Sequence, residues 1–198
     1  MPIEKNASAI VRISKMIQAV EAWAVEYERK NRYDCPGGTV VPKANIGAIR
    51  GGVPWKITKT VQQCAIYVDV RITPMQEPLD VREQLQQLMV EAGLQGEVEL
   101  YVFRPAFEAD EKKAAPLRNA ITNAHRFIVG GEPNVAPVGT SSMWRDLNCF
   151  NEMRIPSLTY GPGVSVGGGI FRMPIETLIT GTKLYVMTAL DLCNQERR

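Results

Sequence analysis

The feature that most constrains the fold is an alternation of side-chain character over residues 64–72. Cys64, Ile66, Val68, Val70 and Ile72 share one parity, while Tyr67, Asp69 and Arg71 share the other. Because successive side chains of a strand point to opposite faces, this pattern predicts a β-strand with one face on a core. On the other face, Asp69 and Arg71 are spaced to form a surface ion pair.

Helical and strand-like patterns surround this segment. Residues 6–31 and 78–93 carry apolar side chains at three- and four-residue steps, which predicts two amphipathic helices. Asn6 is the expected N-cap of the first helix, which should end near Asn31 before a turn over residues 34–38. Shorter apolar runs at 41–49 and 98–102 predict two further strands. The order helix, strand, strand, helix, strand resembles the ferredoxin-like βαββαβ unit with its first strand missing. Such a sheet leaves an open edge, which invites pairing with another chain.

The second part of the chain follows a charged connector. Residues 108–115 (EADEKKAA) mark the predicted boundary between a domain at 1–110 and a domain at 111–198. Beyond it we expect, in order, a helix near 117–128, a short helix at 143–153, a buried strand at 155–160, a glycine-rich loop and a final helix from Pro174. The expected apolar stripe of the final helix consists of Ile175, Ile179, Val186, Ala189, Leu190 and Cys193. The expected fold class is therefore mixed, α+β followed by α/β.

Charge and composition exclude several classes of function. Lys and Arg number 23 against 21 Asp and Glu, so no cationic surplus indicates a nucleic-acid partner. The longest apolar stretch, near 175–193, is interrupted by Lys183 and Asp191, which argues against a membrane span. The start of the chain lacks a signal-peptide pattern, and the four cysteines form no CxxC pair. We expect reduced thiols and a cytoplasmic protein.

Candidate chemistry is sparse. His125 is the single histidine and lies in no HxxxH, HxH or HxxE spacing, so most metal or nucleophile mechanisms would have to draw on carboxylates, cysteines or another chain. The loop GPGVSVGGG has neither GxGxxG nor a GK[ST] ending, and the Thr140–Ser142 hydroxyls are not in a GxSxG elbow. We expect His125 to be a surface residue or to lie at the rim of a core. The residues alone describe an α/β protein with an unfinished sheet and no complete active site.

Four motifs in order extend this interpretation. VVPKANIGAIRGG, CAIYVDVRITP, VREQLQQLM and the later IPSLTYGPG with YVMTALDLC resemble a zinc metallohydrolase and peptidase family. This family includes acetylornithine deacetylase, succinyl-diaminopimelate desuccinylase, aminoacylase and glutamate carboxypeptidase. The resemblance implies that residues 1–110 are the ferredoxin-like lid, or dimerisation domain. It also implies that residues 111–198 are the C-terminal α/β segment of the catalytic domain.

The resemblance also indicates what is missing. Relatives carry most ligands of a two-zinc centre, and the glutamate that acts as general base, in a part upstream of the lid. Glu176 matches a carboxylate of the family near the final helix. Arg172 stands where the family places a last histidine ligand, and a guanidinium cannot coordinate zinc. We therefore assign no catalytic and no metal residue, and expect zinc, the family cofactor, not to bind this chain alone.

Four positions match substrate-binding positions of the family. Asn45 corresponds to a lid asparagine that in relatives reaches the substrate, often in the partner subunit's active site, where an amide can hydrogen-bond a carbonyl oxygen as charge develops. Arg104 is a candidate carboxylate clamp. Gly161 and Gly163 match a turn that approaches substrate closely. A turn-stabilising asparagine and an exposed structural arginine stay open as alternatives.

The resemblance implies a metal-dependent amide hydrolase that acts on N-acyl amino acids or small peptides and forms a homodimer through the lid. Because the ligands and the base are missing, we expect the isolated chain to be inactive. Two alternatives remain: a non-catalytic dimerisation or interaction module, and one half of a split enzyme.

Overall fold

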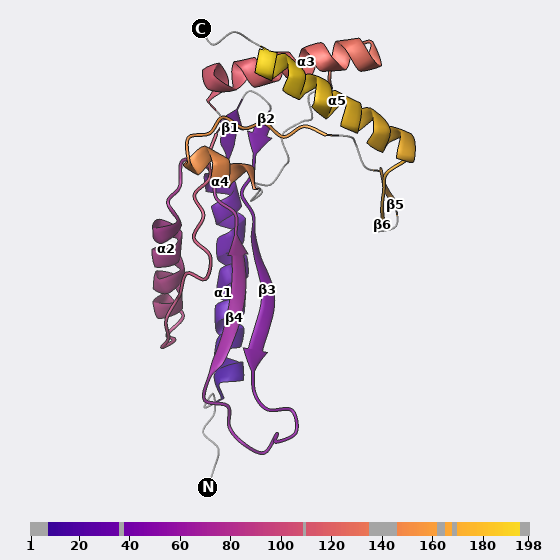
Figure 1. Cartoon of the computed structure of the whole chain (residues 1–198). Coiled ribbons are helices and arrows are strands. Elements are labelled where there is room, and N and C mark those ends of the chain that lie inside the picture. Colours follow the sequence, from indigo (N-terminus) through magenta and orange to yellow (C-terminus); the bar gives the residue numbers. More distant parts are fainter. Residues whose placement is uncertain are drawn as a thin grey trace. The chain divides into compact units, whose positions relative to one another are not determined.

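The computed structural model describes residues 8–35, 38–108, 110–134, 146–161, 165–167 and 170–194. They form two compact units, the first ending at Ala106 and the second beginning at Phe107 (Figure 1). Each unit is described by itself. None of the described helices is long and apolar enough to cross a lipid bilayer.

The first unit is organised around helix α1 (Ala9–Lys30), as the sequence pattern predicts. Its apolar stripe buries Met16, Val20 and Tyr27. The helix ends at Asn31, whose side-chain and backbone N–H groups donate to the Tyr27 carbonyl oxygen at 2.8 and 3.1 Å. These bonds satisfy a carbonyl that has no partner within the helix. The N-cap predicted at Asn6 lies outside the described residues.

Helix α1 covers one face of an antiparallel hairpin, β3 (Ala44–Gly51) with β4 (Cys64–Val70). The apolar face predicted for residues 64–72 packs on the core, as Ile66, Val68 and Val70 contact the buried cluster. A smaller hairpin, β1 (Tyr33–Cys35) with β2 (Gly38–Val40), forms where the sequence indicates only a turn. Three-residue strands are too short to show an alternation in sequence.

Helix α2 (Pro78–Glu91) completes the core of the first unit. Its buried residues Val81, Leu85 and Met89 join the cluster formed by α1. No Cα atom of α2, however, comes within 8 Å of one in β3 or β4, whereas α1 approaches both strands that closely. A helix packed directly on β3 and β4 would bring some of its Cα atoms within 8 Å of theirs, as α1 does. Because α2 does not, it lies beyond the edge of the two-stranded sheet.

The strand predicted at 98–102 is wrong for this chain. These residues are not in a strand, and β4 pairs only with β3 among the described residues. Instead, α2 side chains bind the Val98 backbone: Gln86 Oε1 accepts from its N–H at 2.9 Å, and Arg82 Nε donates to its carbonyl at 2.8 Å. Alternation marks a segment that is able to form a strand, but a strand also needs a neighbour that supplies backbone hydrogen bonds.

The second unit is built on a helix pair. Helix α3 (Glu111–Val129) packs against α5 (Ile175–Asn194), and α4 (Leu147–Glu152) with the hairpin of β5 (Ser165–Gly167) and β6 (Ile170–Arg172) completes it. Asp110 caps α3 by accepting from the N–H groups of Lys112 and Lys113 at 3.1 and 3.2 Å. The Lys113 N–H is the largest cause holding the pKa of Asp110 below its usual value.

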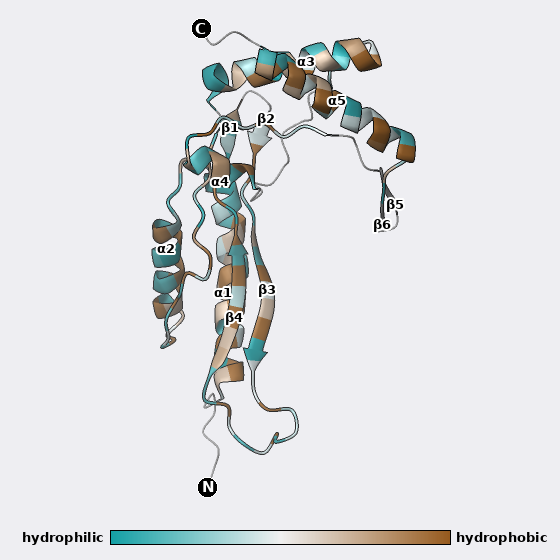
Figure 2. Cartoon of the chain, in the orientation of Figure 1, coloured by the Kyte–Doolittle hydropathy of each residue, from teal (hydrophilic) through white to brown (hydrophobic). Residues whose placement is uncertain are grey.

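Two expectations for the second unit need correction. Residues 155–160 are not in a strand, since no described strand lies alongside to pair with them. The face of α5 that packs inward also differs from the predicted stripe, because α5 buries Gly181, Leu184 and Thr188. Apolar side chains of the predicted stripe, among them Ile175, Val186 and Leu190, are exposed. Figure 2 shows this apolar character along α5.

Candidate functional site

The candidate site of the first unit is the face of the β3–β4 hairpin that points away from α1. Asn45 lies there in β3, directly opposite Asp69 of β4. Arg71 binds that carboxylate through Nη2 at 2.7 Å and Nε at 2.9 Å, which confirms the predicted ion pair. The Asn45 side chain is exposed and has no hydrogen-bond partner in the described part of the chain. Its amide is therefore available to a ligand.

A β-bulge lies next to Asn45. The pairing of β3 with β4 shifts between Ile46 and Ala48, leaving Gly47 without a direct partner. Bulges twist a strand and redirect neighbouring side chains, and they are common beside functional sites. A Cβ at Gly47 would approach Asn45 Nδ2 only to 4.0 Å, so steric crowding does not require glycine here. The irregular pairing thus begins after Asn45, which itself lies in regular register opposite Asp69.

Arg104 is exposed in the first unit, after the residues that the sequence predicted as a strand. Its guanidinium has no ion-pair partner among the described residues. No described contact joins it to Asn45, so the structure does not bring the two candidate residues into one constellation. A free guanidinium can clamp a carboxylate in a bidentate manner, and Arg104 stays a prediction on that ground.

Gly161 of the second unit has a structural role that the sequence did not reveal. The Tyr185 hydroxyl, from α5, donates to the Tyr160 carbonyl at 2.8 Å, and the two rings meet edge to face. A Cβ on Gly161 would lie 3.0 Å from this hydroxyl oxygen. Desolvation and the neighbouring Tyr185 raise the pKa of Tyr160. The matching glycine of the turn, Gly163, lies outside the described residues.

We expect Gly161→Ala to disturb the bond between Tyr185 and Tyr160, because the added methyl group competes for the space of the hydroxyl. The loss should be about 1 kcal/mol, the net worth of one hydrogen bond. Chemical denaturation of the purified variant measures it. Tyr185→Phe should show the same loss, and Gly161→Ala added to Tyr185→Phe should cost nothing further. A full additive loss would contradict this account.

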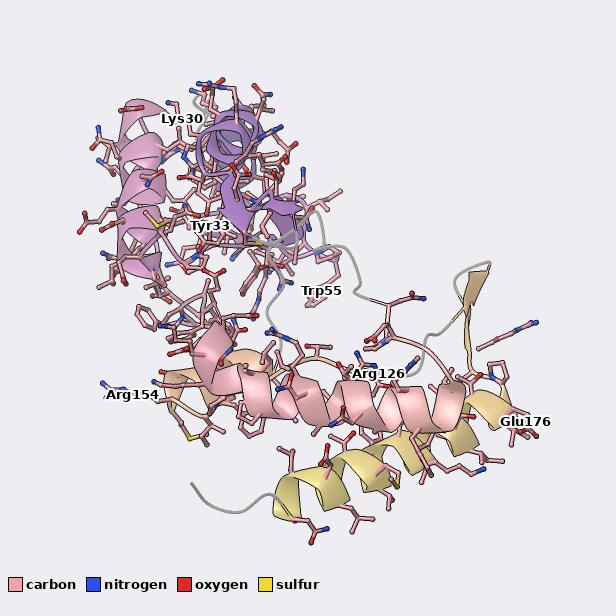
Figure 3. All side chains as sticks on the ribbon, turned by 90° about the horizontal axis from the view of Figure 1, so that it is seen from above. Lys30, Tyr33, Trp55, Arg126, Arg154 and Glu176 are labelled. Atoms are coloured by element: carbon pink, nitrogen blue, oxygen red, sulfur yellow. The ribbon has the colours of Figure 1, made fainter. Side chains whose placement is uncertain are left out.

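The candidate metal-related residues do not form a ligand set. No three His, Cys, Asp or Glu side chains gather in the described ranges where they could hold a metal ion. The Nδ1 of His125 lies 2.7 Å from the Gly131 carbonyl, and because a carbonyl only accepts, Nδ1 carries the proton. His125 thus closes the end of α3. Arg172 ends β6 with an exposed side chain, and Glu176 is exposed in the first turn of α5 (Figure 3). These donors do not fit a zinc centre.

An exposed apolar tip was not singled out by the sequence. The connection between β3 and β4 carries Trp55 at 87% and Ile57 at 86% exposure, with Lys56 between them. Figure 3 labels Trp55 on this connection. The apolar side chains within this polar loop are the one sequence signal of the exposed tip, because residues in a long loop follow no helical or strand periodicity. Contiguous exposed apolar patches mark surfaces that contact other molecules, whereas single exposed apolar side chains are normal.

Comparisons with known proteins bear on both units. Residues 3–97 match the peptidase dimerisation domain. The fold resembles that of an M20 family metallo-carboxypeptidase, Sso-CP2 from Sulfolobus solfataricus, with a TM-score of 0.52 and 18% sequence identity. The match covers 97% of this chain but 45% of that protein, so the chain spans less than half of its length.

Proposed function

The chain belongs to the M20 metallopeptidase family, and on this premise we propose that it supplies the lid and the closing segment of a metal-dependent amide hydrolase. The lid is the ferredoxin-like first unit, and the closing segment is the second unit. The substrates are N-acyl amino acids or small peptides. The observation that carries the proposal is the match of residues 3–97 to the dimerisation domain. The same unit presents the Asn45 side-chain amide beside a β-bulge, without a hydrogen-bond partner among the described residues.

The exposed face of α5 supports the assignment of the second unit. A helix of an α/β domain covers a sheet with its apolar side. Here Ile175, Val186 and Leu190 are exposed, and among the described elements α5 packs against α3, with Tyr185 also bonded to Tyr160. This face suits the sheet of a larger catalytic domain, of the kind that the proposed enzyme would contain.

In the proposed enzyme, zinc would be held outside the described residues of this chain. When bound, zinc in such enzymes supplies a Lewis acid and an activated water. The role of this chain is to bind and orient substrate. The Asn45 amide would donate to the carbonyl oxygen of the scissile amide, and Arg104 would bind a substrate carboxylate. Homodimerisation through the first unit would bring Asn45 to the partner's active site.

The experiment that tests the proposal is an assay of the purified chain with N-acetyl amino acids and dipeptides, with and without added zinc. We expect no turnover and no stoichiometric zinc, because no described cluster can bind the ion. Light scattering should give twice the 22.0 kDa chain mass if the dimerisation domain acts as proposed. Zinc-dependent hydrolysis by the chain alone would overturn the proposal that this chain binds substrate while the zinc ligands lie elsewhere.

A second candidate is a non-catalytic dimerisation module, favoured by the domain match itself. The two candidates differ in the behaviour of the second unit. A module should be a soluble dimer that unfolds cooperatively, whereas part of an enzyme should bind a hydrophobic dye through the uncovered face of α5. Substituting Val186 and Leu190 by lysine should abolish dye binding in the second case.

A further inference from the structure

A surface cavity of about 300 Å³ lies in the first unit between the end of α1 and the segment that leads into β3. It is called the arginine cavity here, and its lining consists of Val25, Glu28, Arg29, Arg32, Val41 and Lys43. This volume lies at the lower end of the range that small-molecule sites occupy. Three cationic side chains, one carboxylate and two valines meet there, and the proposed function assigns no role to any of them.

Both walls of the arginine cavity are anchored to the core of the first unit. The α1 wall belongs to the last two turns of the helix, which the buried Tyr27 fixes in place. On the opposite wall, Pro42 is fully buried between Val41 and Lys43. The Lys43 carbonyl also accepts from the backbone N–H of Arg71 at 2.7 Å. Because both walls are held without a ligand, binding there would cost little ordering of the chain.

The charges that line the arginine cavity are not balanced. Lys43 Nζ binds Glu28 Oε2, so the one carboxylate of the lining is already paired. Arg29 binds Glu26, which lies outside the lining, through Nη2 at 2.8 Å, and exposed pairs of this kind are weak. Arg32 is exposed and has no hydrogen-bond or ion-pair partner among the described residues. The cavity therefore offers a ligand one free guanidinium and a second that is only weakly held.

The dipole of α1 accounts for only part of this set of cations. Cations are favourable near a helix C-terminus, which is sufficient reason for Arg29 and for Lys30, labelled in Figure 3. Arg32, however, lies past the C-cap Asn31, and Lys43 belongs to a different segment of the chain. Like charges that converge on one cavity repel one another, so an anion placed among them would relieve that repulsion.

The two valines narrow the chemistry of the anion. Val25 is exposed and Val41 is half-buried, and both line the same cavity as the guanidinium groups. An inorganic anion would leave these side chains in contact with water, whereas an aliphatic chain would cover them. A guanidinium binds a carboxylate through two parallel hydrogen bonds. The lining thus suits a carboxylate group that carries a short aliphatic chain.

We propose that the arginine cavity binds a small aliphatic carboxylate. The carboxylate oxygens accept hydrogen bonds from the guanidinium groups of Arg32 and Arg29. The aliphatic chain packs on Val25 and Val41. None of the candidate substrate-binding residues lines the cavity, so this binding does not depend on the proposed hydrolase function.

The test titrates the full chain with sodium hexanoate and follows the backbone amides by nuclear magnetic resonance. We expect saturable shifts confined to residues 25–32 and 41–43. Acetate, which lacks the chain, and 1-hexanol, which lacks the charge, should each bind at least tenfold more weakly. Equal binding of hexanol, or equal binding of acetate or inorganic phosphate, would overturn the proposal. Shifts that do not saturate, or that centre elsewhere in the chain, would overturn it as well.

Paired variants locate the binding. Arg29→Gln with Arg32→Gln should weaken hexanoate binding at least tenfold, because both guanidinium groups are removed. Lys15→Gln with Arg50→Gln is the matched control, since it removes the same charge at exposed positions outside the lining and should leave the affinity unchanged. Val25→Ser should lower the affinity for hexanoate but not for acetate. Equal effects of the two double variants would contradict the proposal.

Discussion

Val20→Asp is expected to unfold the first unit. Val20 lies in the middle of α1 and is 1% exposed, within the cluster that α1 forms with α2. A carboxylate at this position would be buried without a partner, which costs about 3–5 kcal/mol. Single domains are stable by about 5–15 kcal/mol, and the narrow two-stranded sheet places this unit near the lower end of that range, where the loss removes most of its stability.

Far-ultraviolet circular dichroism and urea denaturation measure this effect. Val25→Asp is the matched control, because Val25 belongs to the same helix but is 69% exposed. It makes the same chemical change and should shift stability by less than about 0.5 kcal/mol. Equal losses in the two variants would show that helix propensity, rather than burial, governs α1.

Tyr27→Phe is expected to destabilise the first unit by about 1–3 kcal/mol, because it leaves buried polar groups without partners. The Tyr27 hydroxyl donates to the Arg71 carbonyl at 2.8 Å and accepts from Gln76 Nε2 at 2.9 Å. Gln76 in turn accepts from the backbone N–H of Thr73 at 3.0 Å. The Tyr27 hydroxyl therefore links α1 by hydrogen bonds to the turn that follows β4. Tyr101→Phe, at a position 88% exposed, should be neutral.

The same hydroxyl predicts a pH dependence. Burial raises the pKa of Tyr27 to about 12 from 10.0, the ordinary value, so the folded state holds the proton more tightly than the unfolded chain. The stabilisation is fully present below pH 10 and is lost as the pH rises from 10 to 12, by at most about 1.4 kcal/mol per pH unit. Denaturation midpoints of the wild-type protein should approach those of Tyr27→Phe over this interval. A constant difference between the two would contradict the assignment.

The helices were predictable because their signals are local. The apolar stripe of α1 and the position of Pro78 at the start of α2 lie within single segments. The alternation over residues 64–72 likewise predicted β4 and its ion pair, since both depend only on which side of one strand each side chain takes. Asn45 could be singled out by resemblance, but its free amide and the adjacent bulge could not.

The failures share a cause, which is dependence on a neighbour. Residues 98–102 alternate as β4 does, yet they form no strand. In α5 the stripe expected from the sequence is exposed at Ile175, Val186 and Leu190, and contact with α3 buries the face that contains Leu184 instead. The close approach of Gly161 to Tyr185 joins residues far apart in sequence, which no spacing rule signals.

The sequence by itself determined where the helices and the main hairpin form and which family the chain resembles. Only the tertiary structure decided that Val98 is bound by α2, and that within the described ranges β4 pairs on one side and the Asn45 side chain has no partner. The physical reason is range. Side-chain periodicity and helix caps act within a few residues, whereas strand pairing and side-chain hydrogen bonding depend on groups that folding brings together from distant parts of the chain.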